Sequence, residues 1–98
     1  MYSIDIIISK KERWKFKDLL FEKHIKYAEW FMEFDIDNSI VSIEIESGNP
    51  LEELILFLEE KAPNSRVVLP NGSNFRITTK GINKIKQYFI NLYNKDEE

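Results

Sequence analysis

The first part of the chain alternates between apolar and polar positions and then changes to a helical period. Residues 2–9 alternate as a half-buried strand does, and their apolar row is Tyr2, Ile4, Ile6 and Ile8. Ser9 and Glu12 stand at the spacing of a capping box, so we expect a helix from there to about residue 24. The apolar arc predicted for this helix contains Phe16, Leu20, Phe21 and His24.

The next segment is predicted to be a β-hairpin. Two alternating runs, residues 27–36 and 40–46, flank the turn-forming residues 37–39, which are Asp, Asn and Ser. The apolar row of the first run is Trp30, Met32, Phe34 and Ile36. The apolar row of the second run is Val41, Ile43 and Ile45. The pattern predicts one apolar face that packs on the core and one acidic face that meets solvent.

The second half of the chain predicts a helix, a short hairpin and a last helix. Asn49 is placed to cap the first helix, whose core stripe is Leu51, Leu54, Ile55 and Leu58. Two short strands, residues 66–69 and 74–77, flank a turn in which Gly72 takes the left-handed position. Thr78 or Thr79 then caps a helix with the core stripe Ile82, Ile85, Phe89 and Leu92. Two apolar residues, Leu56 and Ile90, point away from these stripes.

The order of these elements predicts an α+β fold. The first six form the β-α-β-β-α-β order of the ferredoxin-like split βαβ sheet, to which a C-terminal strand and helix are added. A length of 98 residues is that of one domain, which we place at residues 1–94. Residues 95–98 are expected to form a frayed acidic tail.

Charge is strongly segregated along the chain, although the formal net charge is only −3. Residues 27–60 contain ten Asp and Glu and no Lys or Arg, whereas residues 1–26 and 61–98 each contain seven Lys and Arg. Segregation of this kind bears on the partners of a protein rather than on its fold.

The acidic face of the hairpin is the candidate partner-binding surface. It is formed in this prediction by Glu29, Phe31, Glu33, Asp35, Glu44 and Glu46. One interpretation is a solvated sheet face, which is common in antiparallel sheets. The other is a recognition surface with Phe31 as its apolar anchor. Like charges directly opposite one another destabilise a sheet, and that favours recognition as the reason for keeping them.

These observations predict a small acidic, non-catalytic domain that docks a basic protein surface. Inhibitors of nucleic-acid enzymes, such as immunity or anti-defence proteins, are similar in size and acidity. The first alternative is a nucleic-acid-binding module that uses the basic first helix, with Lys10, Lys11 and Arg13, and the C-terminal third. A homo-oligomer, in which basic flanks of one chain meet the acidic middle of another, is a further alternative.

The sequence contains no catalytic constellation that we can identify. It lacks cysteine, a Gly-rich phosphate loop and a Gly-x-Ser-x-Gly elbow, so neither an enzyme nor a cofactor is expected. The remaining catalytic alternative is a metal-dependent enzyme at the turn that carries Asp35 and Asp37. No apolar run is long enough to span a bilayer, so we expect a cytoplasmic location and no membrane partner.

Overall fold

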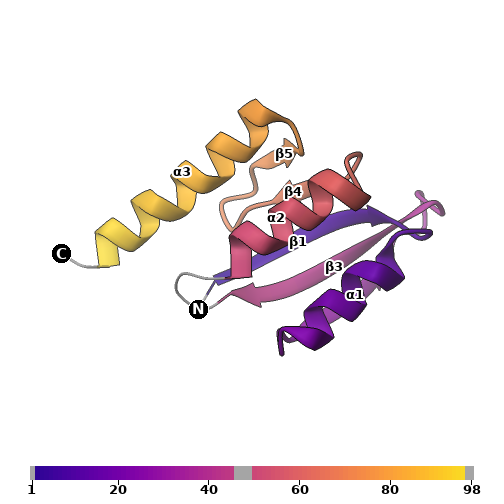
Figure 1. Ribbon diagram of the computed structural model, residues 1–98. Coiled ribbons are helices and arrows are strands. Elements are labelled where there is room, and N and C mark those ends of the chain that lie inside the picture. Colours follow the sequence, from indigo (N-terminus) through magenta and orange to yellow (C-terminus); the bar gives the residue numbers. More distant parts are fainter. Residues whose placement is uncertain (1, 46–49, 97–98) are drawn as a thin grey trace.

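The computed structural model describes residues 2–45 and 50–96, and it has an α+β fold with a five-stranded antiparallel sheet and three helices (Figure 1). In chain order the elements are β1 (Tyr2–Ser9), α1 (Arg13–Glu22), β2 (Tyr27–Phe31), β3 (Asn38–Ile45), α2 (Pro50–Lys61), β4 (Arg66–Val68), β5 (Asn74–Arg76) and α3 (Thr79–Asp96). This is the order of strands and helices that the sequence predicts.

The strands lie in the order β2-β3-β1-β4-β5, and each neighbouring pair is antiparallel. β1 is central, and its Ile6 lies opposite Val41 of β3 and Val67 of β4. Because the sheet is open, β2 and β5 are its two edge strands, and their outer sides are not paired within this sheet.

The hydrophobic core lies between one face of the sheet and the three helices. The sheet contributes Ile4, Ile6 and Ile8 of β1, Val41 and Ile43 of β3, and Val67 of β4, and each helix contributes apolar residues that recur with the helical period. The helical members of this cluster are Phe16, Leu20, Leu54, Ile55, Leu58, Ile82, Ile85 and Phe89. The core stripes predicted from sequence are therefore confirmed at these positions.

The other face of the sheet carries the alternate residues of the same strands. The register places Asp5, Ile7, Trp30, Ile40, Ser42, Glu44, Arg66, Val68, Asn74 and Arg76 on this open face. It is a mixed surface with both apolar and charged groups, and it is not a uniformly acidic one. Within it, the Ser42 hydroxyl donates a hydrogen bond of 2.6 Å to the Asp5 carboxylate.

Helix α1 is shorter than predicted, and its two ends explain why. One of the two capping-box contacts forms, because the Glu12 amide donates to the Ser9 hydroxyl, and that hydroxyl in turn donates to the Glu12 carboxylate, but regular helix begins only at Arg13. At the other end, His24 adopts φ 58°, the His24 amide donates to the Phe21 carbonyl, and the Ile25 amide donates to the Leu20 carbonyl, five residues back. This is a Schellman ending with His24 in the left-handed position.

Two residues assigned to the apolar arc of α1 were placed wrongly. Phe21 is 81% exposed, and His24 is exposed beyond the end of the helix. The helix turns only Phe16 and Leu20 fully into the core, because its ten residues provide few turns. The sequence pattern extended the helix through the residue that in fact terminates it.

Strand β2 differs most from the prediction. It ends at Phe31 and not at residue 36, and its faces are reversed. Glu29 lies opposite Val41 and so points to the helix side of the sheet, whereas Trp30 lies opposite Ile40 on the open face. Phe34 and Ile36, expected in the core, lie in the loop after β2 and are exposed. The alternation was correct, but its assignment to the two faces was wrong.

The C-terminal third follows the prediction closely. Gly72 has φ 88° in the turn between β4 and β5, and the Thr78 hydroxyl accepts the Gly81 amide hydrogen at the start of α3. Helix α3 continues through Asp96, into the segment expected to be a frayed tail. The predicted cap at Asn49 lies outside the described residues, as does the side chain of Leu92. Leu56 and Ile90 are both exposed.

Candidate functional site

The structure does not bring the six predicted partner-binding residues onto one surface. Glu29 and Phe31 lie on the helix side of β2, whereas Glu44 lies on the open face of β3. Glu33 and Asp35 lie in the loop between these strands, and Glu46 is outside the described residues. The uniformly acidic sheet face that the alternation predicted is therefore not formed by the described residues.

The free side of β2 offers unpaired backbone groups. The Glu44 amide donates to the Lys26 carbonyl, so Lys26 and Glu44 form a hydrogen-bonded pair of the β2–β3 ladder. In an antiparallel ladder such pairs alternate, and the N–H and C=O groups of the intervening residues point away from the partner strand. Tyr27, Glu29 and Phe31 therefore direct their backbone groups outward from the edge of the sheet.

Exposed apolar side chains surround this edge. We call the β2 edge surface the set formed by Trp14, Tyr27, Trp30, Phe31, Phe34 and Ile36. Trp30 and Phe31 are about three-fifths exposed, at 59% and 61%, and Phe34 is fully exposed. Single exposed apolar residues are ordinary, but a group of this size around one strand is typical of an interaction surface.

A compact charge cluster supports the helix side of this surface. The Glu29 carboxylate oxygen Oε2 lies 3.5 Å from Lys17 Nζ and 3.8 Å from Arg13 Nε. All three side chains are mostly shielded from solvent, with exposed fractions of 15–17%. The Arg13 guanidinium also donates to the Ser39 hydroxyl at 3.3 Å. Glu29 is thus an internal counter-charge for α1 and is not displayed to a partner.

The same cations lie against three of the aromatic rings of the surface, those of Trp14, Tyr27 and Phe31. The Lys17 ammonium is 4.1 Å from the centre of the Trp14 ring, and the Arg13 guanidinium is 5.4 Å from that of Phe31. Lys10 also lies over Phe31, at 5.3 Å. These cation–π contacts restrict the positions of the exposed rings, so the rings lose less conformational entropy when a partner binds.

The two ends of β2 carry opposite charges. Lys26 precedes the strand and Glu33 follows it, and both side chains are exposed. Neither makes an ion pair with another described residue. The edge therefore has a basic start and an acidic end.

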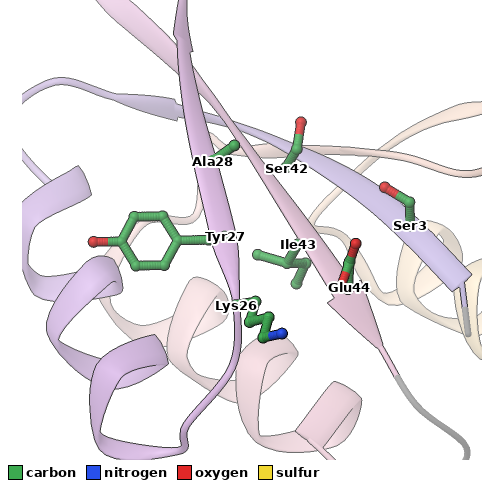
Figure 2. Close-up of a pocket in the computed structure, with 7 residues that line it drawn as sticks. All are labelled: Ser3, Lys26, Tyr27, Ala28, Ser42, Ile43 and Glu44. Carbon is green, nitrogen blue, oxygen red and sulfur yellow. The ribbon is translucent and has the colours of Figure 1, made fainter.

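A shallow hollow of about 210 Å³ adjoins the start of β2 (Figure 2). It is lined by Ser3, Lys26, Tyr27, Ala28, Ser42, Ile43 and Glu44. Figure 2 shows the Tyr27 ring pointing toward α1, on the opposite side of the strand from Ser42 and Glu44. The remaining polar groups are one carboxylate, one ammonium and two hydroxyls. The hollow therefore extends the β2 edge surface onto the open face.

The turn that was considered for a metal is explained by turn chemistry. Asp35 accepts a hydrogen bond from the Asp37 amide at 3.3 Å and another from the Asn38 side chain at 2.7 Å. These are the contacts of an Asx turn. Among the described residues, no group of three or more His, Asp or Glu is placed to hold a metal ion.

Sequence reasoning missed most of the β2 edge surface, because it placed Trp30, Phe34 and Ile36 in the core. The nearby turn residues Asp35, Asp37 and Asn38 are a signal that Phe34 and Ile36 lie at the end of a hairpin, where burial is poor. No known protein-family model matches the chain, and no curated protein is significantly similar to it. Within residues 2–45 and 50–96, no helix combines the length and apolar character needed to cross a membrane.

Proposed function

We propose that this protein is a non-catalytic protein-binding domain that pairs with a second copy of itself through strand β2. The observation that carries the proposal is an edge strand with outward backbone groups, surrounded by exposed and positioned aromatic rings. Addition of a strand to a free sheet edge is a general mode of protein recognition, in which the backbone provides affinity and the side chains provide specificity.

Symmetry restricts how two such edges can pair. A two-fold axis perpendicular to the sheet makes the two β2 strands antiparallel and keeps the helices of both copies on the same side. Side chains of residues that pair across the two strands then lie on the same side of the sheet. The two-fold axis passes beside one central residue of β2, which pairs with the same residue of the second copy. Pairing centred on Glu29 uses the whole strand and joins the outward groups of Tyr27 to those of Phe31 of the partner subunit.

The side chains fit this register. Tyr27 faces the partner's Phe31 on the helix side, and aromatic pairs at facing positions stabilise a sheet. On the open face, the small Ala28 leaves room for the large indole of the partner's Trp30. The central Glu29 is tolerated because Arg13 and Lys17 already neutralise it within each copy.

Charge supports the antiparallel direction. Antiparallel pairing brings Lys26, at the start of one strand, beside Glu33, in the loop after the other strand. The symmetric pair contains this contact twice. In this arrangement, the basic group expected from sequence to meet the acidic hairpin is Lys26 of the second copy. The separated positions of Glu29 and Glu44 give no support to a basic protein docking on a continuous acidic face.

The ferredoxin-like assignment is also part of the proposal. It is supported by the order β4-β1-β3-β2, in which each crossover helix connects strands separated by one other strand. β5 then extends the sheet beyond β4. The absence of cysteine is compatible with a reducing compartment, and we place the domain in the cytoplasm on this ground.

The test is the absolute mass by light scattering after gel filtration, over a range of protein concentrations. The expected mass is about twice the 11.7 kDa of one chain. Trp30→Lys places a charge in the middle of the interface and is expected to produce monomers. Phe21→Lys is the matched control, because Phe21 is an exposed aromatic residue on α1 that lies outside the β2 edge surface. It is expected to leave the mass unchanged.

A charge exchange tests the direction of pairing. Lys26→Glu and Glu33→Lys are each expected to weaken association, and the double variant is expected to restore it. A monomer at all concentrations would refute self-pairing. An oligomer that survives Trp30→Lys but is lost in Phe21→Lys would show that another surface is used.

A further inference from the structure

The opposite edge of the sheet carries a different surface. Arg66 of β4 and Arg76 of β5 are directly opposite each other, on the open face of the sheet. Their neighbours Val67 and Phe75 point to the other side and pack on the core, which fixes the two arginines outward. Both arginine side chains are exposed.

These arginines have no counter-charge among the described residues. Neither makes an ion pair or hydrogen bond with a described side chain. Like charges at directly facing positions of a sheet are destabilising. The arrangement therefore opposes folding slightly, and an anion bound between the two guanidinium groups would relieve the repulsion.

Two adjoining hollows meet at this arginine pair. The larger, of about 330 Å³, is lined by Pro63, Asn64, Arg66, Arg76 and Thr78. The second, of about 190 Å³, is lined by Asn74, Phe75, Arg76, Thr78, Lys80, Gly81 and Lys84. Arg76 and Thr78 line both hollows, so the hollows are neighbours, and we call the two together the Arg66–Arg76 cleft. It is lined by four cationic side chains and by no acidic one.

The segment of the chain that forms the cleft contains no acidic residue. Residues 61–95 contain seven Lys and Arg and no Asp or Glu. The acidic end of the chain follows α3, whose last residues lie far from β5 in Figure 1. On the open face, Asp5 of β1 lies opposite Val68 of β4, and its carboxylate accepts a hydrogen bond from Ser42 and makes no ion pair with Arg66.

The donors in the cleft suit phosphoryl oxygens. Two guanidinium groups on facing strands each present a planar fork that binds phosphate by paired hydrogen bonds. The Thr78 hydroxyl accepts the Gly81 amide hydrogen at 3.1 Å, so its own proton is available as a donor. Lys84, which lies 5.8 Å from the centre of the Phe75 ring, and Lys80 add charge at the far end of the cleft.

We infer that the Arg66–Arg76 cleft binds a phosphate-bearing ligand, through Arg66 and Arg76 with Thr78, Lys80 and Lys84. The shared chemistry is that of phosphoryl groups, which are supplied either by the backbone of a nucleic acid or by a small molecule such as a nucleotide. The inference does not depend on the pairing of β2, because the two surfaces lie at opposite edges of the sheet. Of the basic residues in the first helix, Arg13 and Lys17 are engaged by Glu29.

The test is binding to defined probes in a phosphate-free buffer. Pyrophosphate and ATP are titrated with detection by amide chemical shifts, and labelled single-stranded and duplex oligonucleotides are titrated by fluorescence anisotropy. We expect chemical-shift changes at residues 64–66 and 76–84. We also expect affinity for at least one probe to fall as salt is added. Binding of the small phosphates would identify a nucleotide-sized ligand, and binding of the oligonucleotides alone would identify a nucleic-acid strand.

The decisive variant is Arg66→Gln with Arg76→Gln. It is expected to weaken binding at least about tenfold, because each lost guanidinium removes a charge-assisted contact. For an oligonucleotide, the slope of log affinity against log salt is expected to become shallower by roughly 1.5–2. Lys11→Gln with Lys15→Gln is the matched control, since it removes two exposed cations, one just before α1 and one in its first turn, and is expected to have little effect. The inference is overturned if no probe binds at low salt, or if both double variants weaken binding equally.

Discussion

Glu29 is the residue whose replacement tests the architecture of the β2 side most directly. Its carboxylate is the shared counter-charge of Arg13 and Lys17, and the three side chains are only 15–17% exposed. Replacement by alanine leaves two cations in a site that water reaches poorly. We therefore expect Glu29→Ala to destabilise the fold.

The magnitude follows from the burial of the cluster. A buried polar group left without a partner costs about 1–3 kcal/mol, and more when it is charged. The remaining exposure lets Arg13 and Lys17 reorient partly toward water, so about 1–3 kcal/mol is expected for the cluster as a whole. For a domain of this size each kcal/mol lowers Tm by about 4–8 °C. Glu29→Gln retains the shape and some hydrogen bonding, and its effect is expected to be smaller.

The assay is urea unfolding followed by circular dichroism, with all variants at one protein concentration. Glu53→Ala is the matched control, because Glu53 forms an ion pair with Lys23 in which both side chains are much more exposed. An exposed pair of this kind contributes about 0–1 kcal/mol. Equal losses in Glu29→Ala and Glu53→Ala would refute the reasoning, because the shielding of the Glu29 cluster would then have no energetic consequence.

Five further variants probe other parts of the fold by the same unfolding assay. Gly81→Ala is expected to destabilise by about 1–3 kcal/mol, because an added Cβ would overlap the Arg76 carbonyl oxygen. His24→Gly is expected to stabilise by about 0.5–1 kcal/mol, since φ 58° strains a residue with a side chain. Phe16→Ala is expected to cost about 3–5 kcal/mol, whereas Phe21→Ala stays within about 0.5 kcal/mol. Arg76→Gln in phosphate-free buffer is expected to stabilise by about 0.2–0.5 kcal/mol, the low end of the range because both guanidinium groups are exposed.

Self-pairing and anion binding use separate edges of one sheet, and this has a consequence for experiments. Trp30→Lys is expected to abolish pairing and to leave phosphate binding intact. The double replacement of Arg66 and Arg76 by glutamine is expected to have the opposite effect. A variant that loses both activities would indicate that the sheet itself has been disturbed.

The sequence predicted the buried parts of this protein well. The stripes of α2 and α3 follow a helical period over several turns, and their residues Leu54, Leu58 and Phe89 are buried. The turn at Gly72 and the cap at Thr78 were also predicted correctly, because each depends on the backbone preference or hydrogen bonding of a few adjacent residues. Where one face of a helix or strand is fully covered by the rest of the fold, the apolar positions in its sequence are the residues that are buried.

The prediction was wrong at the edge of the sheet. In residues 27–36 both alternating rows contain aromatic side chains, so the pattern does not show which row is buried. β2 is an edge strand that neither face fully covers, and pairing with β3 decides its orientation. The candidate acidic face depended on that orientation, and Glu29 therefore moved from an expected binding surface to an internal ion cluster. The end of α1 was missed for a similar reason, since His24 is an uncommon residue for a left-handed helix ending.

By itself, the sequence determined the order of the elements, the core stripes of α2 and α3, the apolar rows of β1 and β3, and the segregation of charge. These properties depend on hydrophobic period, local hydrogen bonding and composition, which are set by residues close to one another in the sequence. Only the tertiary structure decided that β2 and β5 are the free edges and that Glu29 is neutralised by α1. It also decided that Arg66 and Arg76 meet in one cleft with the start of α3. Such contacts join residues distant in sequence, and their energy arises only when the sheet and helices pack together.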